Sequence, residues 1–494
     1  MQLKIKLLKW SAGLPVAMLN KKTAEKIGIH PRDMINIKTL SKHPREISAV
    51  IDIIKKRLVK KDEIAVSSEL KKRLNLKIGE KVEISMLIPP NSMNFIKKKF
   101  QNKPLSRKEM DAIIKDVVNN SLSDAEIALF VSALDKYGMT MEETIYLIKA
   151  IQKTGAQLKF RNKFVVDKHS IGGVPGNRTT PIVVSICAAA GLIMPKNSSR
   201  AITSAAGTAD VIETIARVEF SIKELKRIIK KTKAFMIWGG AIGMVPADSK
   251  IIRIERSLKI DPEAQLIASI MSKKLAVDSK YIIIDIPYGK GAKVDRKKAL
   301  RLKRKFKHLG KYFKKNLECV LTDGGQPIGS GIGPVLELED IIKILNPKEK
   351  GPIDLEKKSL LLAGKLFEMT GKAKKGYGIK MAEEILHSGK AFKKFKEIIK
   401  AQDGNLRRLK KAEFTKDIRA KKSGRIIEIS NKKINSLARA AGCPLDKSAG
   451  IYLYAHVGDR IKKGDTIITI HAETLPRLNY TVRYHKKLNP IKIK

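Results

Sequence analysis

The sequence has little of several residue types, and each shortage excludes a class of protein. Its three cysteines, Cys187, Cys319 and Cys443, lie far apart and form no CxxC pair, so we expect neither a disulfide framework nor a cysteine zinc knuckle. Cys187 lies in an apolar segment and is expected in a core. Aromatic residues make up only 5%, which is little material for stacking nucleic-acid bases.

Long hydrophobic runs are also absent. The most apolar stretch, residues 181–195, is too short to span a bilayer and is bounded by prolines. The first ten residues alternate lysine with apolar residues and lack the hydrophobic region of a signal peptide. We therefore expect a cytoplasmic enzyme.

Acidic residues are scarce relative to basic ones, since 49 Asp and Glu stand against 101 Lys and Arg, a formal net charge of +52. The lysines are scattered over every segment, which favours a basic surface suited to a hot or salty cytosol. A nucleic-acid-binding protein is the alternative from another class, and it would require phosphate contacts with a steep salt dependence.

The chain is a folded protein of 494 residues and 43% hydrophobic content, too long for one hydrophobic core. The expected fold class is multidomain α/β. We expect a double-psi-like β-barrel over 1–86, a helical bundle domain over 92–160 that packs with the central domain, a central α/β domain over 161–345 and a C-terminal α+β domain over 346–494. The barrel is expected because residues 19–37 and 66–84 repeat a pattern of strand, short helix, turn and alternating strand. Residues 87–90 are expected to form a stiff linker.

Three helices of the bundle have legible starts. Each begins with a capping box followed by an apolar stripe, namely Ser106 with Glu109, Ser123 with Glu126, and Thr140 with Glu143. We expect these helices to serve packing only.

The stretch 164–210 carries the first chemical signal. Residues 164–166 are expected to form a buried strand, Gly172, Gly173 and Gly176 a loop, and Thr180 with Pro181 a helix start with Thr at the N-cap. Such a loop before a helix N-terminus binds anions. A second serine- and threonine-rich loop follows at 198–208. The pair predicts a site for two phosphates, or for phosphate and a phosphorylated substrate.

Further glycine loops at 239–243, 289–293 and 324–327 also follow predicted strands, and ligands bind beyond the carboxyl ends of such strands. These loops offer hydrogen-bond donors, whereas the sequence has no HExxH, Walker, GxSxG or GxGxxG motif. Donor-rich loops without a metal site or nucleophile suit a reaction in which phosphate itself attacks. Phosphorolysis of an N-glycosidic bond is such a reaction, and it also requires a proton for the departing base.

Six blocks in order resemble the thymidine/pyrimidine nucleoside phosphorylase family, and within it an archaeal branch that cleaves nucleotides: DKHSIGGVPGNRTTP, SSRAITSAAGTAD, WGGAIG, KIDPEAQLIASIMSKKLAV, DIPYGKGAKV and TDGGQPIGSGIGPVLE. The resemblance covers essentially the whole chain, including a barrel that the bacterial members lack. It implies that AMP and phosphate give adenine and ribose 1,5-bisphosphate, with CMP and UMP as further substrates. It also implies a route to a form III RuBisCO, no cofactor, and a homodimer or larger homo-oligomer.

The resemblance also implies roles for individual residues. Asp261 corresponds to the proton donor. The implied nucleotide ligands are Gly173, Ser199, Arg200, Ala201, Ile202, Thr203, Ser204, Thr208, Ser269 and Lys293. The implied ligands of inorganic phosphate are Lys168, Ser170 and Ser198. Residues 174–177, Val-Pro-Gly-Asn, depart from the Gly-Asp pair of the bacterial members, which favours the nucleotide branch.

Other interpretations of these residues stay open. Asp261 precedes Pro262 and could serve only as a helix N-cap, and Lys293 could be a solvated lysine. His169 could orient phosphate or be structural. Second-rank candidates for contacts to base or sugar are Ser272, Lys273 and Lys274.

Two other enzymes remain alternatives. One is a pyrimidine nucleoside phosphorylase acting on uridine or thymidine. The other is a phosphoribosyltransferase, which would normally need magnesium and a diphosphate substrate.

Overall fold

The computed structural model describes residues 1–494 except 9, 13–14, 42, 55–57, 87–89, 202–203 and 241–242. Most of the predicted linker, and the predicted nucleotide ligands Ile202 and Thr203, lie outside the described residues. The chain divides into two compact units, Met1–Thr154 and Gly155–Lys494, which are described separately.

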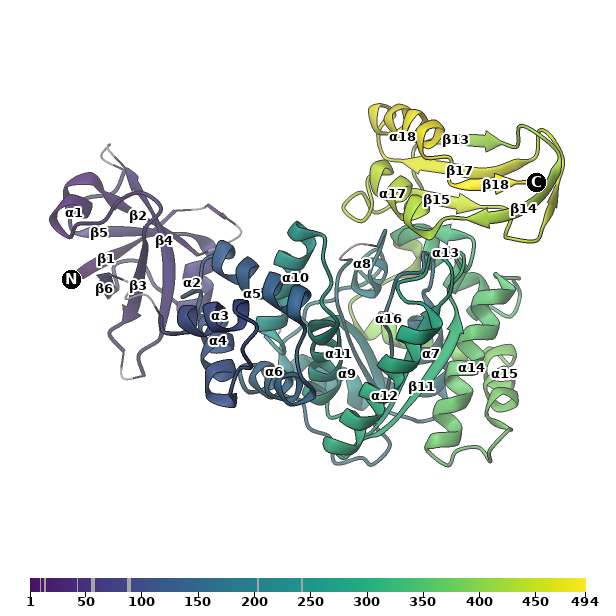
Figure 1. Ribbon diagram of the computed structural model, residues 1–494, viewed down its shortest axis with the longest axis horizontal. Coiled ribbons are helices and arrows are strands. Elements are labelled where there is room, and N and C mark those ends of the chain that lie inside the picture. Colours follow the sequence, from purple (N-terminus) through teal and green to yellow (C-terminus); the bar gives the residue numbers. More distant parts are fainter. Residues whose placement is uncertain are drawn as a thin grey trace. The chain divides into compact units, whose positions relative to one another are not determined.

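The first unit begins with a closed β-barrel (Figure 1). Its strands are β1 (Gln2–Leu7), β2 (Val16–Asn20), β3 (Met34–Thr39), β4 (Glu46–Ile54), β5 (Glu63–Val66) and β6 (Lys81–Met86), in the order β1-β5-β2-β4-β3-β6. The internal repeat is confirmed, because β2, α1 (Lys21–Lys26) and β3 in one half match β5, α2 (Ser68–Leu74) and β6 in the other. Alternate residues of β1, β2 and β3 fill the barrel core.

Four helices complete this unit: α3 (Ser92–Phe100), α4 (Arg107–Asn119), α5 (Asp124–Tyr137) and α6 (Met141–Lys153). The three predicted capping boxes are confirmed at the starts of α4, α5 and α6. Glu143 of the third box is buried and does more than cap. Its carboxylate accepts hydrogen bonds from Lys99 Nζ at 2.9 Å, Leu105 N at 2.9 Å and Thr140 N at 2.9 Å.

The second unit is built on parallel strands. Strands β7 (Val166–Ser170), β10 (Tyr281–Tyr288) and β11 (Asn316–Asp323) form a three-stranded sheet in the order β11-β10-β7. Strands β8 (Met194–Ser198) and β9 (Ala234–Trp238) form a parallel pair, joined to β7 by an isolated bridge between Val165 and Ile193. Because every strand runs the same way, all the glycine loops leave one edge of the sheet.

The first of these strands is longer than predicted. The strand expected at 164–166 extends through Ser170, so Asp167 and Lys168 lie within it rather than in the loop. Two charged residues do not end the strand here because both side chains are buried among partners of opposite charge or hydroxyl groups.

Helices surround the parallel strands. They are α7 (Thr179–Ala189), α8 (Thr208–Ile212), α9 (Ile222–Thr232), α10 (Pro246–Leu258), α11 (Glu263–Ala276), α12 (Arg296–Tyr312), α13 (Pro334–Leu345), α14 (Ile353–Met369), α15 (Gly378–His387) and α16 (Lys390–Ala401). Helix α7 is almost wholly buried, includes Cys187, and packs against α14 and α16. The helices from 353 to 401 thus share the core of the α/β domain, although the sequence grouped them with the last domain; the predicted boundaries themselves stay predictions.

The chain ends in a β-rich domain, yellow and yellow-green in Figure 1. One sheet has the order β12-β15-β17-β13 and contains β12 (Gly331–Ile332), β13 (Phe414–Arg419), β15 (Gly450–Leu453) and β17 (Thr466–Ala472). The other contains β14 (Gly424–Ile429), β16 (Arg460–Ile461) and β18 (Ile491–Ile493). Helices α17 (Asn431–Ala441) and α18 (Leu475–Leu488) pack against each other and against β17. Among the described residues, no helix combines the length and apolar character needed to cross a bilayer.

The buried Glu143 generates a stability prediction. Glu143→Gln leaves the ammonium group of Lys99 buried without a negative partner, which costs about 3 kcal/mol of unfolding free energy. Calorimetry of the full chain should show a lower melting temperature. The control, Glu126→Gln, changes the less buried box of α5 and should cost no more than about 1 kcal/mol. Equal shifts in the two variants would contradict the importance of the buried pair.

Candidate active site

Lys168 is the central cation of the first glycine loop. Its side chain is buried, and its Nζ donates to Thr179 Oγ1 at 2.5 Å and to Thr180 Oγ1 at 3.5 Å. Helix α7 begins at Thr179 with Arg178 as its N-cap, so the prediction that Thr180 is the N-cap is wrong. The two hydroxyl groups hold the lysine instead. Burial lowers the pKa of Lys168 to about 7, although nearby Asp285 opposes the shift.

Asp285 connects the loops that follow β7, β10 and β11. It is fully buried and forms an ion pair with Lys358 at 3.1 Å. It accepts hydrogen bonds from Thr322 Oγ1 at 2.6 Å and from Asn177 Nδ2 at 3.3 Å, and Asn177 Nδ2 also donates to Ser170 Oγ at 3.2 Å. Burial alone would raise the pKa of Asp285, but Lys358 and Lys168 outweigh burial and hold it below its ordinary value. The departure at 174–177 therefore supplies the amide that links Ser170 to Asp285.

A second buried cluster lies behind Lys168. Asp167 forms ion pairs with Lys196 at 3.0 Å and Lys274 at 2.5 Å, and Lys196 Nζ also donates to the carbonyl oxygen of Lys168 at 2.5 Å. The neighbouring His169 has a pKa well below its ordinary value because of burial and the surrounding lysines, of which Lys274 acts most strongly. His169 is therefore neutral, and its Nδ1 has no hydrogen-bond partner within the described part of the chain.

The predicted ligand Ser269 lies on α11 beside a third buried pair. Lys273 Nζ donates to Ser269 Oγ at 2.6 Å and forms an ion pair with Asp248 of α10. Gln265 Nε2 donates to Asp248 at 3.2 Å. Of the second-rank candidates, Lys273 thus contacts a predicted nucleotide ligand, whereas Lys274 faces Asp167.

Asp261, Lys293 and Gly173 lie together. Lys293 Nζ forms an ion pair with the Asp261 carboxylate and donates to the carbonyl oxygen of Ile171 at 3.3 Å. Gly173 has φ of +93°, and a Cβ at this position would lie 2.7 Å from Lys293 Cβ, so only glycine fits. The N-cap of α11 is Pro262, and the carboxylate of Asp261 is paired with a lysine instead of capping the helix. Asp261 and Lys293 remain partly exposed, at 39% and 24% of their side chains.

Sequence reasoning missed a carboxyl group in this region. Glu255, near the end of α10, is buried, and its Oε1 has no hydrogen-bond partner among the residues that the structure describes. Burial raises the pKa of Glu255 to about 8, and the negative charges of Asp261 and Asp248 add to the shift. The available signal was periodicity, because Glu255 follows Ile251 and Ile252 on the apolar face of its helix.

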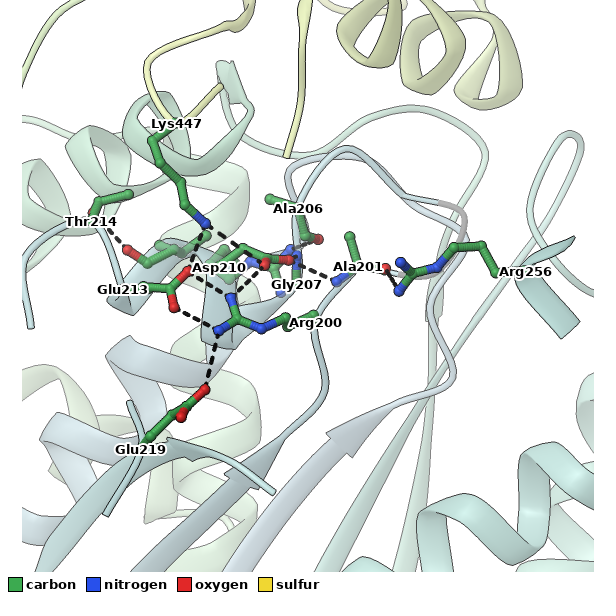
Figure 2. A network of polar contacts seen from close by, with 12 residues as sticks. Arg200, Ala201, Ala206, Gly207, Asp210, Glu213, Thr214, Glu219, Arg256 and Lys447 are labelled. Carbon is green, nitrogen blue, oxygen red and sulfur yellow. Dashed lines mark hydrogen bonds and ion pairs between the residues drawn. The ribbon is translucent and has the colours of Figure 1, made fainter. Parts of the chain in front are cut away.

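The second predicted loop, 199–207, is held by a network of charges (Figure 2). The Arg200 guanidinium donates to both carboxylate oxygens of Glu213 at 2.6 Å, lies 3.4 Å from Asp210 and stacks over the Trp238 ring. Arg200 lowers the pKa of Glu213 to about 2, and Lys447 contributes to the shift. The predicted ligand Arg200 is thus directed at carboxylates in this structure.

Backbone groups of the same loop are bound as well. Asp210 Oδ2 accepts from Ala201 N at 2.7 Å and from Gly207 N at 2.8 Å. A Cβ on Gly207 would lie 2.6 Å from the carbonyl oxygen of Ser199, so the loop closes tightly on itself. Arg178 Nη1 donates to Thr208 Oγ1 at 3.0 Å.

The remaining predicted serines have distinct surroundings. Ser204 Oγ donates to the carbonyl oxygen of Ala206 at 3.0 Å. Ser198 is buried at the end of β8, and its Oγ lacks a hydrogen-bond partner in the chain as described. The structure thus joins Gly173, Lys293 and Asp261 in one group and Arg200, Ala201 and Thr208 in another, with Lys168 and Ser170 at the first loop.

The C-terminal domain also contacts these loops, which the sequence did not predict. Asn431 Nδ2 donates to the carbonyl oxygens of Gly291 at 3.3 Å and Gly324 at 2.8 Å. Asn435 Oδ1 accepts from Ala205 N at 3.1 Å, and Lys447 donates to Glu213 at 2.8 Å. Three of the predicted ligand loops are therefore positioned from outside the α/β domain.

Family models match three parts of the chain. Residues 93–155 match the helical bundle domain of a glycosyl transferase family, 162–392 match the a/b domain of a glycosyl transferase family, and 425–492 match the pyrimidine nucleoside phosphorylase C-terminal domain. Among solved structures, anthranilate phosphoribosyltransferase from Thermus thermophilus is similar in fold, with a TM-score of 0.52 at 16% identity over 63% of this chain and 99% of that one.

Curated relatives match over nearly the full length. The AMP phosphorylase of Thermococcus kodakarensis is 44% identical, with 100% of this chain and 98% of the relative covered. The AMP phosphorylase of Pyrococcus furiosus is 43% identical over 99% of this chain and 97% of the relative. A putative thymidine phosphorylase of Legionella pneumophila is 42% identical over 90% and 85%. At this identity and coverage, the chain belongs to the nucleoside phosphorylase family that includes the archaeal AMP phosphorylases.

Proposed function

We propose that this protein cleaves the N-glycosidic bond of AMP with inorganic phosphate and releases adenine and ribose 1,5-bisphosphate. The observation that carries the proposal is the buried positive charge at the carboxyl edge of the sheet. Lys168 has no carboxylate within ion-pair distance among the described residues, although it is buried. Burying a charge without a counterion is costly, so this ammonium group suits a substrate anion.

The proposed roles follow from the surroundings of each residue. Lys168 and Ser170 would hold the attacking phosphate, and Asn177 holds Ser170 in place. Ser198 offers a buried hydroxyl whose hydrogen-bonding capacity is unused within the described chain. Phosphate bound there would attack C1′ of the ribose as the bond to the base breaks. Asp261, beside Lys293 and Gly173, would then supply the proton that the departing base requires.

Lys293 is the proposed partner of the nucleotide 5′-phosphate. It is partly exposed and next to Gly173, whose lack of a side chain lets the backbone approach closely. The loop 199–207 and Thr208 would bind the rest of the nucleotide, with Ser269 on α11. Arg200 has a different proposed part. Since its guanidinium is engaged by Glu213, we expect it to hold the loop in shape and to offer backbone groups to the ligand.

The wider expectations stay predictions. These are CMP and UMP as substrates, a form III RuBisCO route for the product, a homodimer or larger assembly, no cofactor and a cytoplasmic location. Phosphorolysis that persists in EDTA would support the expectation of no metal.

Incubation with AMP and phosphate tests the proposal directly. We expect phosphate-dependent release of adenine together with a sugar bisphosphate, measured by chromatography and ³¹P NMR. Uridine and thymidine are the comparison substrates, because the relative from Legionella pneumophila is named a putative thymidine phosphorylase. Faster phosphorolysis of uridine or thymidine than of AMP would favour a pyrimidine nucleoside phosphorylase instead.

Lys293→Ala should weaken recognition of the 5′-phosphate. Loss of one charge-assisted contact is worth about 1.5–3 kcal/mol, or roughly 10-fold to 100-fold in kcat/KM for AMP. The same variant should change kcat/KM for adenosine far less. The matched control is Lys290→Ala, because Lys290 lies on the same loop but is exposed and pairs with Glu428. An equal loss with AMP and adenosine would contradict the phosphate contact.

Lys168 generates a pH prediction. Its pKa of about 7 means that the free protein carries the positive charge below pH 7 and loses it above. The KM for phosphate should therefore rise as the pH increases from 6.5 to 8.5. Lys168→Arg stays charged throughout, so its KM for phosphate should vary less over that range, whatever its absolute value. Parallel pH profiles for the two proteins would contradict a role of the Lys168 charge.

A further inference from the structure

The proposed proton donor is in an unfavourable state to donate. Asp261 forms an ion pair with Lys293, and its side chain is 39% exposed. A carboxylate paired with an ammonium group and open to water is ionised at neutral pH, because both features stabilise its negative charge. In the free protein Asp261 therefore has no proton to give, and a general acid needs one before the bond to the base breaks.

Glu255 lies in the opposite environment. It is buried, and its Oε1 has no hydrogen-bond partner in the described part of the chain. An ionised carboxylate is strongly disfavoured in such a place, so the neutral acid is the stable form. The pKa of Glu255, raised to about 8 by burial and then by Asp261 and Asp248, agrees with this reasoning.

The two carboxyl groups are close through the turn that connects their helices. Glu255 lies in the last turn of α10, and its carbonyl oxygen accepts from the backbone N–H of Ile260 at 3.2 Å. Asp261 is the next residue in the chain. The other charges that act on Glu255 are Asp248 on its own helix, Lys273 on α11 and Lys293 after β10. This turn joins a buried acid to an exposed carboxylate at the edge of the candidate site.

We propose that Glu255 is a positioning residue for the transferred proton, which it stores and passes to Asp261 when the nucleotide binds. The inference rests on the proposed function. When the 5′-phosphate of AMP takes Lys293, Asp261 loses its positive partner and becomes a better proton acceptor. The proton moves from the Glu255 carboxyl to Asp261 and then to a ring nitrogen of the base. The C1′–N bond breaks as the C1′–O bond to phosphate forms, and Glu255, left ionised, regains a proton from water.

The kinetic test uses Glu255→Gln, which keeps the shape of the side chain and removes the proton. We expect kcat for AMP to fall about 100-fold, with KM changed no more than about twofold. In the wild type, kcat should fall as the pH rises through about 8, because Glu255 ionises there. This decline should be absent from Glu255→Gln, and Glu255→Asp should recover part of the activity. A wild-type pH profile in Glu255→Gln would overturn the proposal.

The matched control is Glu263→Gln. Glu263 begins α11 and pairs with Arg301 and Lys305, and its replacement should leave kcat and its pH profile unchanged. A readout without turnover is infrared difference spectroscopy of the free protein between pH 7 and 9. The wild type should show a protonated carboxyl band that Glu255→Gln lacks. If AMP is cleaved but the band is missing, this inference alone fails; if AMP is not cleaved, the proposed function and the inference fail together.

Discussion

The arrangement of the site depends on lysine side chains that are buried where the parallel strands end. Lys168, Lys196, Lys273, Lys274 and Lys358 are each no more than 7% exposed, and their buried acidic partners are Asp167, Asp248 and Asp285. Removing an ammonium group from water is costly unless negative charge or hydrogen bonds replace the water. Most of these lysines have a carboxylate, whereas Lys168 has two threonine hydroxyls. The structure therefore stores an unmet preference for an anion at one defined place, and substrate phosphate would meet it.

What could be predicted from the sequence was local. Capping boxes such as Ser106 with Glu109 involve residues one turn apart, so their pattern is visible in the chain. The partners of Asp167 and Asp285 are distant in sequence, and no local pattern joins Asp285 to Lys358. Thr180 illustrates the same limit, because its place beside proline suggested a cap while the fold gave its hydroxyl to Lys168. The predicted site residues came from resemblance, whereas Glu255 and Asn431 had no motif to reveal them.

The C-terminal domain belongs to the site in a physical sense. Asn431 binds the carbonyl oxygens of two glycine loops, and Asn435 and Lys447 reach the loop 199–207 and the carboxylate that holds Arg200. Glycine loops gain freedom from lacking side chains, and that freedom has to be limited before they can bind a ligand in one geometry. Contacts from a separate domain provide this restraint without adding side chains to the loops themselves.

The contrast between Asp261 and Glu255 bears on the choice between nucleotides and nucleosides. Two carboxyl groups in different environments can divide a task, because burial keeps one protonated while an exposed ion pair keeps the other charged. On the proposal that the 5′-phosphate draws Lys293 away from Asp261, a nucleoside would bind without releasing that carboxylate. Its base would then lack a proton at the moment of departure. Binding energy from the phosphate would be expressed in the chemical step, so discrimination against nucleosides would exceed what the lost contact alone contributes to affinity.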